Sequence, residues 1–117
     1  MEKVKFTERG TELTAALSGE LDHYLAASVR EKIDVQISKT RPSRFVLDVS
    51  GVSFMDSSGL GLIMGRYTVC RRYGASFRLR GADGRAMKIL ELAGLDGVIQ
   101  TDPPAEGGKK DEEQTGE

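Results

Sequence analysis

The residues most able to do chemistry lie in one segment, residues 53–61, which read SFMDSSGLG. Asp56 and the two serines after it offer oxygen atoms that can cap the free N–H groups at the start of a helix. The segment also holds Gly59 and Gly61, and a glycine inside a helix costs about 1 kcal/mol relative to alanine. Two glycines so near a helix start therefore call for a reason, and close access of another protein to a serine hydroxyl is one.

Other uses of this segment stay open at the level of sequence. Its aspartate and serines could act only as a helix N-cap. A nucleotide-binding loop fits poorly, because the spacing of Gly59, Gly61 and Gly65 does not match GxGxxG and no GxxxxGK[ST] motif is present. A serine hydrolase also fits poorly, since there is no GxSxG elbow and the one histidine is His23. Such a hydrolase would need Ser57 as the nucleophile and His23 as its base.

The elements before this segment are predicted to be two strands, a helix and a third strand. Alternating apolar residues predict a hairpin over residues 3–18. Asp22 or His23 is placed to cap a helix. The nearly continuous apolar run 45–49 is typical of a central strand covered on both faces, and residues 51–55 are predicted to be a short connection. The helix would bury one stripe of apolar side chains four residues apart: Leu25, Val29, Ile33 and Ile37.

The elements after it complete an α/β pattern. Residues 56–58 begin a helix whose predicted apolar face is formed by Leu60, Ile63, Met64 and Tyr67. Residues 76–80 alternate as a strand, Asp83 can cap a third helix that Gly94 ends, and residues 98–99 are a short last strand. The order ββαβαβα, then a short β, predicts a small α/β domain with a mixed central β-sheet and helices packed against it.

Composition excludes several classes of protein. The chain of 117 residues is long enough for one small domain. It has neither an apolar run long enough to span a membrane nor the apolar start of a signal peptide, and the single Cys70 can form no internal disulfide or structural zinc site. A cytoplasmic location and a monomer are expected. The formal net charge of −1 gives no general attraction to nucleic acid or to an anionic membrane.

The charge is unevenly distributed along the chain. Residues 102–117 contain six acidic and two basic residues, and their only apolar side chains are those of one alanine and two prolines. We therefore predict a domain over residues 1–101 and a disordered acidic tail over residues 102–117. The domain is correspondingly basic, and five arginines are predicted to form a solvated face that could steer an acidic partner: Arg66, Arg71, Arg72, Arg78 and Arg80.

Two motifs resemble a known family. Residues 19–23 read GELDH, and residues 53–61 are followed by Gly65-Arg66-Tyr67. Together they closely resemble the anti-sigma factor antagonists of the STAS domain family, and most of all the sporulation branch that acts on the anti-sigma factor of sigma factor F. The resemblance runs from about residue 2 to residue 100.

The resemblance implies a switch and not an enzyme. In this family the unphosphorylated antagonist binds an anti-sigma factor, which is also a serine kinase, and the sigma factor is released. The kinase then phosphorylates the first serine of the Asp-Ser-Ser-Gly motif, which is Ser57 here, and a serine phosphatase reverses the reaction. ATP and magnesium belong to the kinase, so no cofactor or metal is expected in this chain. The alternative is a phosphoregulated scaffold of the same fold in a stress-response pathway.

The surface around Ser57 is predicted to bind the partner. The second and third strands should end at the same edge of the sheet, which would gather Glu20, Asp22, Phe54, Asp56, Ser58 and Gly59 near Ser57. Of Phe54 and Met55, one is expected in the core and the other exposed. Gly59 and Gly61 are expected to leave the serines uncovered, and Gly61 with Gly65 to let the helix approach its neighbours closely. A helix N-terminus favours an anion, so a phosphate on Ser57 should change binding without unfolding the domain.

Overall fold

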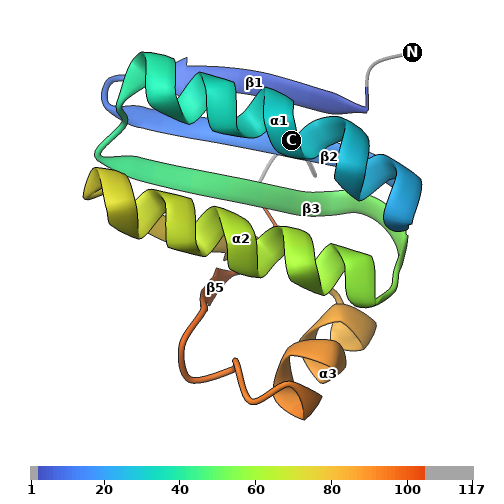
Figure 1. Ribbon diagram of the computed structural model, residues 1–117. Helices are drawn as coiled ribbons and strands as arrows, with labels where there is room; N and C mark the ends of the chain where they lie inside the picture. The colour runs from blue at the N-terminus through green and yellow to red at the C-terminus, as the bar shows by residue number, and fades with distance from the viewer. Residues whose placement is uncertain (1–2, 105–117) are drawn as a thin grey trace, which may run out of the picture.

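The computed structural model describes residues 3–104, which form one five-stranded sheet and three helices (Figure 1). The elements follow the order β1 (Val4–Arg9), β2 (Glu12–Leu21), α1 (His23–Thr40), β3 (Arg44–Met55), α2 (Ser57–Tyr73), β4 (Ser76–Arg80), α3 (Gly84–Leu92) and β5 (Gln100–Asp102). The strands lie in the order β1-β2-β3-β4-β5; β1 runs antiparallel to β2, and the other pairs are parallel. The predicted fold class is confirmed. The predicted acidic tail lies almost wholly outside the described residues, and Asp102 is the last residue of β5.

Helices α1 and α2 lie side by side over one face of the sheet (Figure 1). The four apolar residues predicted to form the stripe of α1 are all buried. They pack in one core with the inward residues of the central strands, such as Phe45, Leu47 and Leu79, and α3 adds Ala86 and Leu90 to the same core. Burial of this apolar surface is the main force that holds the helices on the sheet.

The other face of the sheet is held by cross-strand polar contacts. Val46 is fully buried there between its register neighbours Thr14 and Arg78. Arg78 donates two hydrogen bonds to the carboxylate of Asp102, at 3.1 Å from Nε and 3.0 Å from Nη2, so β5 is fixed to β4 by a bidentate ion pair as well as by its backbone.

Two predicted strand boundaries are wrong. Residues 51–55 are part of β3 and not a connection, because β2 continues to Leu21 and pairs with them. The pairing has two register shifts, at each of which β3 contains one residue more than β2, and Gly19 of β2 lies between them with a φ of +100°, a conformation that favours glycine. The last strand is Gln100–Asp102 and not residues 98–99, since Ile99 is buried in the core just before it.

The buried face of α2 agrees with the prediction in part. Ile63 is buried, and Leu60 and Tyr67 pack against the core while partly exposed, whereas Met64 is outside that core. The fully buried residues of this helix are Gly59, Leu62, Ile63, Arg66 and Cys70. Burial raises the pKa of the Cys70 thiol to about 12, so this side chain is a neutral core residue at physiological pH.

Candidate functional site

All three helices begin at one edge of the sheet, where β2, β3 and β4 end. Each begins after an aspartate whose carboxylate accepts a hydrogen bond from a backbone N–H in the first turn. The distances are 3.0 Å from Leu25 N to Asp22, 2.8 Å from Ser58 N to Asp56 and 2.9 Å from Ala86 N to Asp83. We call this the carboxyl edge of the sheet. It is the edge at which ligands and partners meet parallel α/β sheets.

The first two of these helix starts are adjacent. Glu20 lies opposite Phe54 and Leu21 opposite Met55 in the parallel pairing of β2 with β3. Beyond the strand ends, the amide of Asp56 lies 3.5 Å from the carbonyl oxygen of Leu21. The structure therefore brings Glu20, Asp22, Phe54 and Asp56 together at the carboxyl edge, as the sequence predicts.

Ser57 is the first residue of α2 and its side chain is exposed. Asp56 already caps the helix, so the Ser57 hydroxyl is not used as the cap. Ser58 is partly buried, and its backbone N–H is the group that donates to Asp56. Of the two serines, Ser57 thus has the more accessible hydroxyl and stands where the helix dipole favours a negative charge.

The role of Gly59 differs from the expected one. It is buried, and a β-carbon placed on it would lie 2.5 Å from Met55 Cγ and 3.1 Å from Leu21 Cγ and Cδ2. Gly59 therefore lets the first turn of α2 pack directly on the ends of β2 and β3. It sets the position of the Ser57 hydroxyl and does not serve to uncover it.

Gly61 and Gly65 also differ from expectation. Neither would bring a β-carbon within 4 Å of another part of the described chain, so they do not serve a close approach of α2 to its neighbours. Instead they line a groove of about 360 Å³ between α1 and α2, which also includes His23 and Ser58 at the carboxyl edge.

The apolar residues at the carboxyl edge divide as predicted between core and surface. Met55 is buried, whereas Phe54 is 41% exposed. Tyr24, in the first turn of α1, is 80% exposed. Two large apolar side chains in solvent beside an exposed serine are typical of a protein-binding surface.

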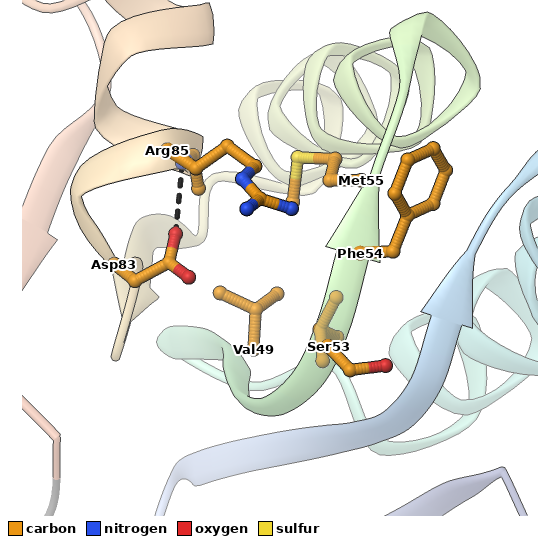
Figure 2. Close-up of a pocket in the computed structure, with 8 residues that line it drawn as sticks. Val49, Ser53, Phe54, Met55, Asp83 and Arg85 are labelled. Atoms are coloured by element: carbon orange, nitrogen blue, oxygen red, sulfur yellow. Dashed lines mark hydrogen bonds between the residues drawn. The ribbon is translucent and has the colours of Figure 1, made fainter.

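The hollow between the end of β3 and the start of α3 is small. Figure 2 shows Met55 and Val49 on one side of it and Asp83 with Arg85 on the other. Its volume of about 10 Å³ holds about one water molecule, which is too little for a nucleotide or another cofactor.

Two specific arrangements, a hydrogen-bonded Ser57–His23 pair and a cluster of metal ligands, do not occur in the described part of the chain. Within residues 3–104, no hydrogen bond joins Ser57 to His23, whose ring instead contacts Tyr24 edge-on at 5.6 Å between centroids. No group of three potential metal ligands occurs in that range. None of the described helices combines the length and apolar character needed to cross a bilayer.

The predicted basic face is wrong, because its arginines lie on different surfaces. Arg78 is on the open face of the sheet, whereas Arg66 is buried under α1 with its Nε 2.8 Å from the carboxylate of Asp34. Burial, helped by the neighbouring charge of Arg30, lowers the pKa of Arg66, and Asp34 opposes that change. The sequence contained a signal for this burial, since Arg66 stands four residues before Cys70 on the apolar stripe.

Comparisons with known proteins agree on one family. Residues 3–106 match the STAS domain. The anti-sigma F factor antagonist of Paenibacillus polymyxa is 36% identical over 83 residues, which cover 71% of each chain. The anti-sigma-B factor antagonist of Bacillus subtilis is 29% identical over 105 residues, 90% of this chain and 94% of the relative. The solved structure of the anti-sigma factor antagonist SpoIIAA in its unphosphorylated form has the same fold, with a TM-score of 0.73 at 24% identity over 91% of this chain and 90% of that one.

Proposed function

This chain belongs to the STAS domain family, and we propose that it is an anti-sigma factor antagonist whose binding is switched off by phosphorylation of Ser57. The observation that carries the proposal is the exposed Ser57 at the start of α2, on an edge of the sheet that also presents two carboxylates and two exposed aromatic side chains. The unphosphorylated chain binds an anti-sigma factor and thereby frees the sigma factor. The chain acts by binding and is not an enzyme.

The partner supplies the chemistry of the switch. The anti-sigma factor is a serine kinase that holds ATP and magnesium and transfers the γ-phosphoryl group to the Ser57 oxygen, while the serine proton leaves to a base of the kinase. A serine phosphatase restores the hydroxyl. This chain contributes an accessible hydroxyl on a fixed helix start, in the cytoplasm where these partners act.

The physical effect of the phosphate falls on the interface. Phosphoserine adds about −1.5 to −2 charges at pH 7. At position 57 the free N–H groups of α2 stabilise that charge, so the fold tolerates it. On contact with the partner the same charge has to be desolvated beside Asp56 and Asp22, and an unmatched buried charge costs several kcal/mol.

The direct test is to locate the phosphate. After incubation with MgATP and the anti-sigma factor kinase of the same organism, we expect phosphate on Ser57 and none on Ser58, because Ser57 is exposed and Ser58 is partly buried. Phosphopeptide mapping by mass spectrometry reads out the position. Ser57→Ala should abolish incorporation, whereas Ser58→Ala should retain it. Phosphate mainly on Ser58, or phosphate incorporated without the kinase, contradicts the proposal.

A second test concerns Asp22. Asp22→Asn removes the charge but keeps a side chain that caps helices about as well, so the melting temperature should hardly change. Binding to the anti-sigma factor should weaken by about 1 kcal/mol or somewhat more if the carboxylate faces a basic partner residue. Isothermal titration calorimetry measures this loss, and Asp83→Asn at the start of α3 is the matched control. Equal affinities for Asp22→Asn and the unaltered chain would remove Asp22 from the interface.

The relatives include antagonists named for sigma F and for sigma B. The second candidate function is therefore the same phosphorylation switch acting on the anti-sigma-B factor, or a phosphoregulated scaffold in a stress-response pathway. Titrating the chain against each anti-sigma factor of its own organism assigns the pathway. The identity of 36% to a sigma F antagonist favours the sigma F pathway, and with it a role in sporulation.

A further inference from the structure

The groove between α1 and α2 is lined by unusually small side chains. Ala26 and Ala27 of α1 face Gly61 and Gly65 of α2 across it, and the groove has a volume of about 360 Å³. Both glycines are in a helix interior, where alanine is the better helix former, and a β-carbon at either position would meet nothing within 4 Å in the described chain. Packing inside this domain therefore gives no reason for them, whereas an incoming side chain does.

The groove also contains an incompletely satisfied buried charge. Arg66 lines it and is only 5% exposed. Its Nε is close to Asp34, yet within the described residues Nε makes no well-aligned hydrogen bond and Nη1 has no hydrogen-bond partner. A buried guanidinium nitrogen without a partner is rare and calls for an acceptor. Arg30 lies on the rim of the same groove and is exposed.

The groove is continuous with the carboxyl edge. His23 and Ser58 line the end at which both helices begin, and Ser58 is the neighbour of Ser57. The eight residues from Ser58 to Arg66 correspond to about 12 Å along α2. A partner that contacts Ser57 can therefore extend a side chain or a short segment along the groove as far as the two arginines.

We propose that this groove receives an acidic side chain of the anti-sigma factor, whose carboxylate pairs with Arg30 on the rim and with the part of the Arg66 guanidinium that lines the groove. The proposal rests on the proposed function and adds the second half of its docking surface. The small residues leave room for the incoming chain, and the two guanidinium groups recognise a carboxylate with their planar arrays of donors.

Calorimetric titration with the anti-sigma factor kinase of the same organism tests the groove. Gly65→Leu fills it and Arg30→Glu inverts the charge on its rim. Each should raise the dissociation constant about tenfold or more. Thr68→Leu and Arg72→Glu make the same kinds of change at exposed positions of α2 outside the groove and should leave the constant within about twofold. The melting temperature of Gly65→Leu should not fall, because the position is open.

The outcomes separate the two claims. If the unaltered chain does not bind any anti-sigma factor, the proposed function fails and this inference fails with it. If the unaltered chain binds and both groove variants bind equally well, only the groove inference is overturned. If Gly65→Leu loses binding and Arg30→Glu does not, the groove is part of the interface but the claim that it recognises a partner carboxylate is overturned. If deletion of residues 105–117 shifts the NMR amide signals of Gly61 and Gly65 in the free chain, the chain's own acidic tail occupies the groove, and the partner carboxylate is overturned.

Discussion

Replacing Ser57 with aspartate is expected to weaken binding to the anti-sigma factor about a thousandfold, which corresponds to about 4 kcal/mol, while the fold stays intact. The substitution places a carboxylate at the first position of α2, where the helix dipole favours an anion. Asp56 remains the cap, so no hydrogen bond of the fold is lost. In the complex, however, the new charge is desolvated beside Asp56 without a partner. Thermal melting and calorimetric affinity, measured on the same sample, separate the two effects.

The matched control for this variant is Thr68→Asp. It adds the same charge to an exposed position of the same helix, 11 residues or about 16 Å beyond Ser57. Ser57→Ala is the second control and should bind without responding to ATP. If Ser57→Asp and Thr68→Asp lose equal affinity, or if the loss of affinity follows a loss of stability, then Ser57 is only part of a helix start. The proposal that its phosphorylation switches binding off is then wrong.

Replacing Gly59 with valine is expected to lower the free energy of unfolding by about 3 kcal/mol. Its β-carbon would stand 2.5 Å from Met55 Cγ, and the two γ-methyl groups would add further overlap with Leu21. Relief of these clashes requires α2 to move away from the ends of β2 and β3, which also displaces Ser57. Denaturant unfolding measures the stability, and the rate of phosphorylation of Ser57 should fall with it.

Gly61→Ala is the control for backbone effects in the same helix. A β-carbon at this position meets nothing, so the gain in helix propensity should raise the free energy of unfolding by up to about 1 kcal/mol. Substitutions at these two glycines, which are separated by a single residue, are thus expected to change the free energy of unfolding in opposite directions. A stabilised Gly59→Val would show that the close packing of this turn on the sheet is incorrect.

Local features of the fold could be predicted from the sequence. Asp83 caps α3 as expected, and the caps of α1 and α2 come from the predicted groups of candidates, because a cap depends on a hydrogen bond within three residues along the chain. Asp22 and not His23 caps α1, and Asp56 and not a serine caps α2. The apolar stripe of α1 is buried as predicted, since the spacing of four residues leaves one face for the core. The position of Ser57 on the carboxyl edge followed from these same local rules together with the parallel order of the strands.

Features that depend on distant parts of the chain could not be predicted. The extension of β3 to Met55 depends on pairing with the end of β2, more than thirty residues earlier, and the apolar content of residues 51–55 alone does not indicate it. The role of Gly59 depends on Met55 and on Leu21. The groove depends on which faces α1 and α2 turn toward each other, so the open positions of Gly61 and Gly65 could be seen only in three dimensions.

The two edges of the sheet bear on how the chain behaves at high concentration. On one side the sheet ends in β5, which has only three residues and is followed by Pro103 and Pro104. Proline has no N–H to donate, so β5 does not lengthen past Asp102 and the edge that a further strand could join is only three residues long. On the other side, β1 is short and exposes charged side chains such as Lys5 and Arg9. Both edges therefore offer little to the strand-to-strand addition that leads to aggregation.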